Sequence, residues 1–119
     1  MRGEYDATRL AALPAGWRNR YFEQDRVNPE IWRISRQVRA SVRFAVVNLL
    51  HPLGEVGTFD VIFCRNVMIY FEQPTRDQLV DRLVHQLVPG GYLFTGHSET
   101  LLRLPPSLSY VQPATYRKS

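Results

Sequence analysis

An arginine and an asparagine, Arg65 and Asn66, separate two apolar runs in the string FDVIFCRNVMIYF, residues 59–71. Arginine suits paired hydrogen bonds with a carboxylate or a phosphate. A buried strand that ends in polar groups beside an apolar loop is a common way to build a ligand site. The string therefore directs the search for function to the end of this strand.

Two further polar clusters follow apolar stretches. Asn48 and Leu49 end the stretch SVRFAVVNLL, and His97, Ser98 and Glu99 follow YLFTG. In open α/β sheets, ligands bind in the crevice beyond the carboxyl ends of the strands. A polar residue that merely caps a strand is the simpler interpretation of any one cluster, but three together favour a ligand site.

A parallel sheet would bring these clusters together. The run FDVIFC, residues 59–64, is continuously apolar, which is typical of a strand covered on both sides. The pattern predicts a helix over Thr75 to Val88 and a strand over YLFTG, residues 92–96, which completes a βαβ unit. Ser41 to Leu50 predicts an earlier strand, and LSYVQPATYRK, residues 108–118, predicts a closing antiparallel hairpin.

The long helix has recognisable signals at both ends. Thr75 and Gln78 have the spacing of a capping box, and Pro89-Gly90-Gly91 is expected to end the helix. Between these signals the apolar residues recur at helical spacing. The stripe consists of Leu79, Val80, Leu83, Val84, Leu87 and Val88.

The first forty residues show shorter patterns. Tyr5 to Leu13 predicts a short helix, Glu30 to Ser35 is β-prone, and residues 36–40 predict a single helical turn. The chain of 119 residues is long enough for one small domain but not for two. It contains one cysteine, no apolar signal core and no apolar run long enough to span a membrane, so we expect a cytoplasmic protein without membrane insertion.

Arginine supplies nearly all of the positive charge. The net charge is +4, and 14 of the 15 basic residues are arginine. Seven of them lie between Arg18 and Arg43, which favours an acidic partner surface, although a solvated arginine-rich surface is an equal alternative. A nucleic-acid binder is disfavoured because the aromatic residues are not interleaved with the basic ones. No metal site is expected.

The string CRNVMIYF, followed by PGGYLFTGHSE and preceded by VNLL, resembles the chemotaxis receptor methyltransferases of the CheR type. The resemblance implies a Rossmann-like α/β fold and transfer of a methyl group from S-adenosyl-L-methionine to glutamate side chains of methyl-accepting chemotaxis receptors. The product of the cofactor is S-adenosyl-L-homocysteine. The chain would thus be a protein-glutamate O-methyltransferase in chemotaxis adaptation.

The resemblance also implies roles for individual residues. Asn48 and Leu49 would contact the adenosine part of the cofactor, and Arg65 and Asn66 would line the cofactor cleft. Tyr70 would lie close to the transferred methyl group. As hypotheses for catalysis, Arg65 holds the glutamate carboxylate and Tyr70 places its ring by the sulfonium cation. A core aromatic between strand and helix is the alternative for Tyr70.

The family sheet has the strand order 3-2-1-4-5-7-6, and only strands 3 to 7 have equivalents here. Strands 1 and 2, the glycine-rich cofactor loop, the acidic residue that binds the ribose and the N-terminal helical domain are not found in the sequence. We therefore expect a C-terminal portion of the family domain over residues 1–119, inactive alone. About 21–43 would form a small receptor-docking β-subdomain, and 44–119 the cofactor-cleft half.

In this partial sheet, strand 4 would have an unpaired edge. Either Ser41 to Leu50 would cover this edge, or a second chain would cover it through dimerisation or strand exchange. Docking on receptors would use four arginines: Arg33, Arg36, Arg39 and Arg43.

The alternative function is a non-catalytic module that binds a receptor or another acidic protein. Such a module would derive from a truncated paralogue, and the lack of a glycine loop favours it.

Overall fold

The computed structural model describes residues 3–54 and 56–119. The chain divides into two compact units, Met1–Val46 (unit 1) and Val47–Ser119 (unit 2). In the described part of the chain, no helix is both long and apolar enough to cross a membrane.

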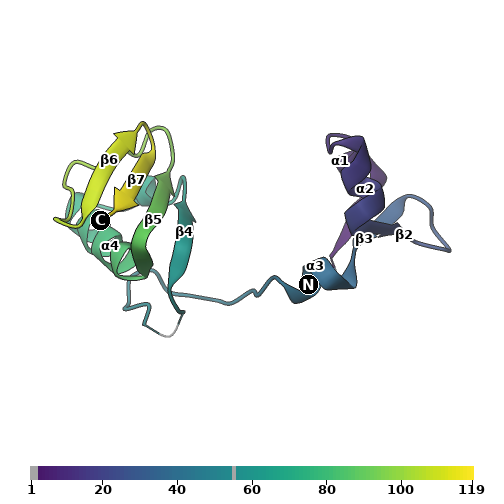
Figure 1. The fold of residues 1–119 in the computed structure, drawn as a ribbon, viewed down its shortest axis with the longest axis horizontal. Coiled ribbons are helices and arrows are strands. Elements are labelled where there is room, and N and C mark those ends of the chain that lie inside the picture. The colour runs from purple at the N-terminus through teal and green to yellow at the C-terminus, as the bar shows by residue number, and fades with distance from the viewer. Residues whose placement is uncertain (1–2, 55) are drawn as a thin grey trace. The chain divides into compact units, whose positions relative to one another are not determined.

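Unit 1 is built around a three-stranded antiparallel sheet in the order β1-β3-β2 (Figure 1). The predicted β-prone segment forms the central strand β3, and the predicted helical turn forms α3, whose N-cap Ser35 accepts a hydrogen bond from the Val38 amide. The elements are β1 (Glu4–Asp6), α1 (Ala7–Leu10), α2 (Ala15–Tyr21), β2 (Phe22–Gln24), β3 (Ile31–Ile34) and α3 (Arg36–Ala40).

The helix predicted over Tyr5 to Leu13 is wrong at its start. Tyr5 lies in β1, opposite Trp32 of β3, and its ring packs edge-on against Phe22 with the centroids 5.7 Å apart. Pairing in the sheet therefore overrides the local helical preference, and only Ala7–Leu10 remains helical.

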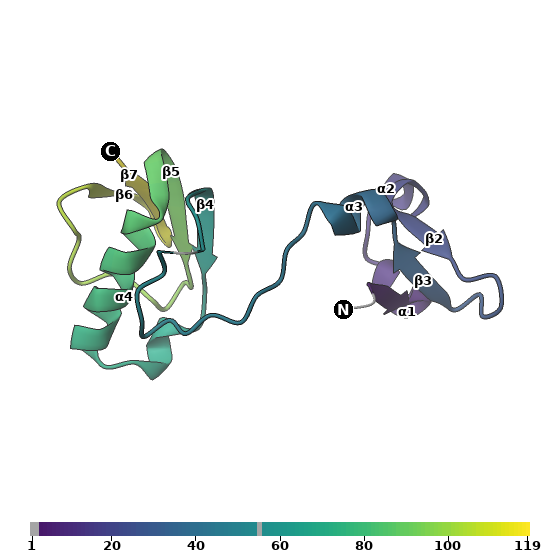
Figure 2. The same ribbon diagram turned by 90° about the horizontal axis from the view of Figure 1, so that it is seen from below.

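Unit 2 has a four-stranded sheet in the order β4-β5-β7-β6, with α4 packed on one face (Figure 2). The pair β4 and β5 is parallel, and the other two pairs are antiparallel. The predicted βαβ unit and hairpin are confirmed, and the order agrees with 4-5-7-6 in the family sheet. The elements are β4 (Phe59–Cys64), the 3-10 helix η1 (Met68–Tyr70), α4 (Gln73–His85), β5 (Leu87–Thr95), β6 (Leu108–Gln112) and β7 (Thr115–Lys118).

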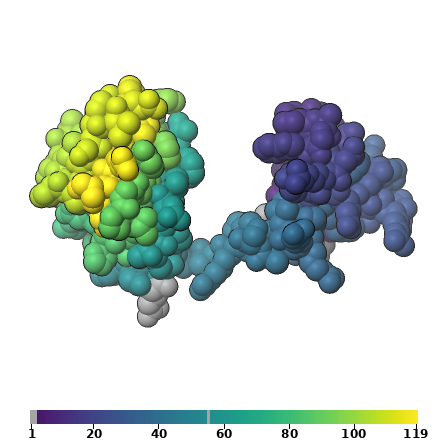
Figure 3. Space-filling model, viewed as in Figure 1, coloured from purple at the N-terminus to yellow at the C-terminus, as the bar shows by residue number. Residues whose placement is uncertain are grey.

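The core of unit 2 lies between α4 and the sheet. The predicted stripe of α4 is buried as expected, at Leu79, Val80, Leu83 and Val84. These residues pack with partners from the strands, from η1 and from the loop before β4. The partners are Leu53, Cys64, Met68, Leu87, Leu93, Leu108 and Tyr116. In the space-filling view the surface of this unit runs from the yellow hairpin β6–β7 across green β5 to teal residues (Figure 3).

Both ends of α4 differ from the prediction. The N-cap is Glu72, Pro74 occupies the first turn, and no side chain caps the helix, so the predicted capping box does not form. At the other end, the Lys118 ammonium donates to the carbonyls of Val84 and Leu87, at 2.9 and 2.8 Å. The first of these bonds satisfies a carbonyl of the last helical turn. The chain then enters β5 at Leu87, so the helix ends before the Pro-Gly-Gly sequence that was expected to end it.

Two predictions about strands are wrong. Residues 42–48 have no strand structure, so the expected strand over Ser41 to Leu50 does not form. A strand needs a partner for its backbone groups, and β4 pairs only with β5 among the described residues. Strand β4 is also not covered on both faces, because Val61 and Phe63 are 43% and 71% exposed. In addition, β4 lies at the edge of the sheet.

Candidate functional site

The parallel pairing of β4 and β5 brings two of the three predicted polar clusters together. Cys64 lies opposite Thr95 at the carboxyl ends of the two strands. Arg65 and Asn66 follow β4, and the loop through Glu99 follows β5. The predicted convergence is therefore observed for these two clusters, at the edge of the sheet where α/β proteins bind ligands.

Glu99 connects the two loops through backbone hydrogen bonds. Its carboxylate accepts hydrogen bonds from the amides of Asn66 at 2.6 Å, Gly96 at 2.9 Å and Ile69 at 3.1 Å. The residue is only 2% exposed. Burial alone would raise the pKa of this carboxyl, but the surrounding amides, including that of Met68, outweigh burial and lower it. Glu99 is thus a buried, ionised anchor, and His97 and Ser98 beside it are exposed.

The third cluster is anchored to the helix. The guanidinium of Arg82 in α4 donates to the Leu49 carbonyl at 2.9 Å, which holds this loop against unit 2. The Asn48 side chain accepts from the Leu50 amide at 3.0 Å and so closes a local turn. Leu49 is half-buried and packs on the core, whereas Asn48 is exposed.

Leu49 and Arg65 line the same open hollow, of about 350 Å³. Its walls are mainly apolar, with contributions from Ile62, Phe63 and Val67. Asn48, Asn66 and Tyr70 are not among its lining residues. The structure thus brings together one residue from each predicted cofactor pair, with an apolar wall between them that sequence reasoning did not predict. The alternation of side-chain directions along β4 could have indicated this wall, because it places Phe63 on the exposed face of the strand.

Tyr70 lies in η1 and is 80% exposed. This exposure excludes the alternative that Tyr70 is a core aromatic. The ring is therefore available to a ligand or a partner, although it does not border the hollow beside β4.

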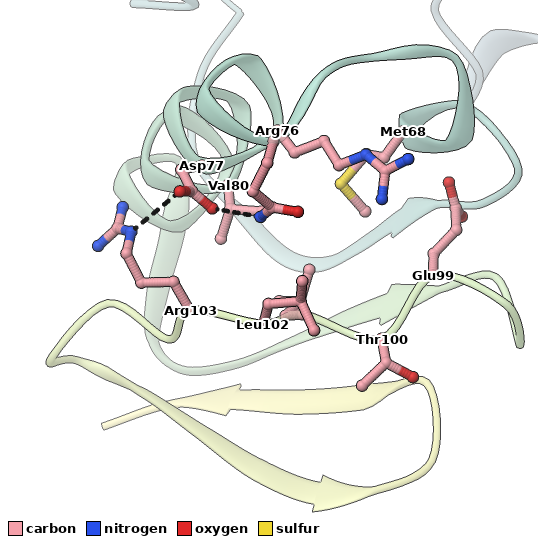
Figure 4. Close-up of a pocket in the computed structure, with 10 residues that line it drawn as sticks. Met68, Arg76, Asp77, Val80, Glu99, Thr100, Leu102 and Arg103 are labelled. Atoms are coloured by element: carbon pink, nitrogen blue, oxygen red, sulfur yellow. Dashed lines mark hydrogen bonds and ion pairs between the residues drawn. The ribbon is translucent and has the colours of Figure 1, made fainter.

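A second pocket, between η1, α4 and the loop after Glu99, is too small for a substrate (Figure 4). Its volume of about 10 Å³ holds one water molecule at most. Asp77 accepts from the Gln73 amide group at 2.8 Å and pairs with Arg103 at 3.7 Å. The Arg76 guanidinium donates to the Phe71 carbonyl at 2.7 Å. These contacts brace the turn between η1 and α4.

The hollow runs along a parallel strand and has apolar walls, with a guanidinium at the carboxyl end of that strand, where α/β sheets bind ligands. Comparison with known proteins identifies the class. The chain matches the family described as CheR methyltransferase, SAM binding domain, over residues 1–116, and it belongs to that family.

Individual relatives agree with this assignment. The chain is 40% identical over 111 residues to chemotaxis protein methyltransferase Cher2 of Pseudomonas putida, covering 92% of this chain and 40% of the relative. It is 36% identical over 118 residues to a chemotaxis protein methyltransferase of Borreliella burgdorferi, covering 98% and 41%. The chain thus spans about two fifths of the length of these relatives.

The hollow fits only part of S-adenosylmethionine. The flat face of an adenine ring suits the apolar wall of Leu49, Phe63 and Val67. A ribose is usually held by a carboxylate, and no acidic side chain lines this hollow in the described part of the chain. The residues present therefore fit the adenine end of the cofactor and not its ribose.

Cys64 ends β4 within the site but is not a nucleophile at neutral pH. Burial, followed by the nearby charge of Glu99, raises the pKa of its thiol from 9.0 to about 11. A group whose pKa is higher in the folded than in the unfolded protein contributes stability below its unfolded pKa. This contribution is lost as the pH rises through the folded pKa.

We therefore expect wild-type protein to lose stability relative to the variant Cys64→Ala as the pH rises from about 9 to about 11. The loss should approach about 2 kcal/mol, since each unit of pKa shift corresponds to about 1.4 kcal/mol. Urea unfolding of both proteins across this range measures the difference, in which other titrating groups cancel. A difference that does not change with pH would contradict the buried thiol.

Proposed function

We propose that this chain forms the adenosine side of the cofactor cleft in a protein-glutamate O-methyltransferase, which methylates chemoreceptors in the cytoplasm during chemotaxis adaptation. The observation that carries the proposal is the shared hollow that runs along β4, with Leu49 in its wall and Arg65 where the strand ends. Membership of the CheR family and the names of the relatives support the same reaction.

The proposed chemistry makes modest demands on the protein. When bound, S-adenosylmethionine supplies a methyl group on a positively charged sulfur. The attacking glutamate is already ionised near neutral pH, so the site needs no general base and must mainly align the two reactants. Arg65 would hold the glutamate carboxylate, and the exposed ring of Tyr70 would lie near the sulfonium. Asn48 and Asn66 would hydrogen-bond the cofactor at the rim.

Two observations support the proposal that the chain alone is not a competent enzyme. No described acidic residue lines the hollow, and β4 is paired along only one edge. A non-catalytic module that binds a receptor or another acidic protein is the second candidate, favoured by the separate, arginine-rich unit 1. Methyl transfer by a completed enzyme distinguishes the two candidates.

The completed enzyme is made by joining this chain to the part of the P. putida relative that it does not match. Arg65→Ala and Tyr70→Phe should each lower turnover more than about tenfold, because misplaced reactants lose much of the benefit of alignment. Transfer of radiolabelled methyl groups to a chemoreceptor measures turnover, and thermal unfolding measures stability.

Tyr110→Phe is the matched control, since Tyr110 is an exposed tyrosine of β6 far from η1 in the sequence. Its turnover should equal that of the parent. Normal turnover of both site variants, or a loss that follows a lower melting temperature, would refute the assigned roles. No transfer by the parent fusion would favour the binding module.

We also propose that unit 1 docks on an acidic receptor surface through Arg36, Arg39 and Arg43. Arg33, the fourth candidate, has its charge offset by Glu4 at 3.2 Å and Asp25 at 2.7 Å. No described acidic residue forms an ion pair with Arg36 or Arg43. Arg33 therefore contributes more to the sheet of unit 1 than to docking.

If this docking is correct, the affinity of the chain for receptor should fall as salt rises, because exposed charges are screened beyond about 8 Å at physiological ionic strength. Arg36→Glu with Arg43→Glu should slow association more than it speeds dissociation. Surface plasmon resonance at several salt concentrations measures both rates. Arg9→Glu with Arg26→Glu is the control of equal charge, and an affinity that is independent of salt would refute the proposal.

We further propose that two chains cover the bare edge of β4 by pairing with each other. Phe59, Val61 and Phe63 are exposed on one face of this edge strand, and residues 42–48 do not pair with it. An exposed apolar edge is a template for strand addition.

Light scattering should therefore show a mass that rises with protein concentration. Val61→Lys should keep the chain monomeric, because lysine on an edge strand opposes pairing. Hydrogen exchange at residues 61–64 provides a second readout, with slower exchange at high concentration. A wild-type chain that stays monomeric at all concentrations would rule out this dimer.

A further inference from the structure

We infer that Glu99 is a positioning residue of the cleft. Its carboxylate fixes the backbone from Asn66 to Ile69, and with it the directions of the flanking side chains of Arg65 and Tyr70. The functional importance of those two side chains rests on the proposed function, but the positioning itself does not.

The contacts of Glu99 reach both sides of the segment that it holds. One carboxylate oxygen accepts from Asn66 at 2.6 Å and from Gly96 at 2.9 Å, and the other accepts from Ile69 at 3.1 Å. An ionised carboxylate is purely an acceptor, so it can serve all three donors at once. Hydrogen bonds to a charged group are roughly twice as strong as neutral ones. Loss of the charge should therefore release the segment on both sides of Met68.

The backbone around Glu99 is closely packed. Asn66 has a φ of 61°, a left-handed conformation that asparagine tolerates better than most residues. A Cβ atom at Gly96 would lie 2.6 Å from both the Asn66 side-chain oxygen and the Glu99 carboxylate. Gly96, Asn66 and Glu99 thus form one interlocked unit, in which the carboxylate compensates the unfavourable backbone conformation of Asn66.

The neighbouring side chains do not provide a substitute for this carboxylate. Arg76 and Arg103 border the small pocket next to Glu99, but they donate to carbonyls and to aspartates. They offer no acceptor to the Asn66 and Ile69 amides. The variant Glu99→Gln keeps the size of the side chain, removes the charge and replaces one of the two acceptor oxygens with an NH2 donor.

Hydrogen exchange of the whole 119-residue chain, followed by NMR, tests the inference. In Glu99→Gln the amides of Asn66, Ile69 and Gly96 should exchange about ten- to a hundredfold faster than in wild type, as expected for the loss of charged hydrogen bonds. The amides of Leu83 and Val84, in the core of α4, should not change. The control Glu72→Gln removes an exposed carboxylate without a side-chain cap and should change none of them.

Two results would overturn the inference. Unchanged exchange at Asn66 and Ile69 would show that the carboxylate does not hold them. Equal acceleration of all core amides would show a general loss of stability instead of positioning. If Glu99→Gln does not fold, Glu99→Asp takes its place, because it keeps the charge but is one carbon too short to reach both loops.

The exchange experiment contains neither cofactor nor receptor, so failure of the proposed methyl transfer leaves its outcome unchanged. Conversely, the fusion enzyme tests Arg65 and Tyr70 without changing Glu99. The two claims can therefore fail separately.

Discussion

The parallel pairing of β4 with β5 is the constraint on which the rest of unit 2 depends. A parallel pair needs a crossover connection, and α4 supplies it while burying its apolar stripe on the sheet. The pairing places Cys64 opposite Thr95, so the loops after both strands start at the same edge. The carboxylate of Glu99 then joins these loops, and the hollow of Leu49 and Arg65 lies among β4, the end of α4 and the loop before β4.

The elements of unit 2 could be predicted from the sequence because local pattern and tertiary packing agree there. The stripe of α4 recurs at helical spacing, YLFTG is a continuous apolar strand within the longer β5, and turn residues mark the final hairpin. The predicted strand over Ser41 to Leu50 failed because its sequence favours a strand only when a partner is present. The helix from Tyr5 failed for the opposite reason, since pairing with Trp32 draws Tyr5 into a sheet. Strand partners are chosen by tertiary structure, which short windows of sequence do not contain.

The site was predictable in position but not in detail. Polar residues at strand ends indicated where Arg65, Asn66 and Glu99 would meet. Their spacing could not show that Glu99 turns inward to three amides while Tyr70 turns out to solvent, because such directions depend on backbone angles like the positive φ of Asn66. The sequence also treated four arginines as equivalent, whereas Arg33 is held by Glu4 and Asp25 within unit 1.

The adenosine side of the cleft is the central claim, and an NMR titration of the chain with S-adenosylhomocysteine tests it most directly. The account predicts binding weaker than micromolar, with the amide signals of Leu49, Phe63 and Arg65 shifting first, because the hollow fits adenine and offers no carboxylate to the ribose. Signal shifts confined to other parts of the chain would contradict the account. So would the absence of any shift at the highest ligand concentration that dissolves.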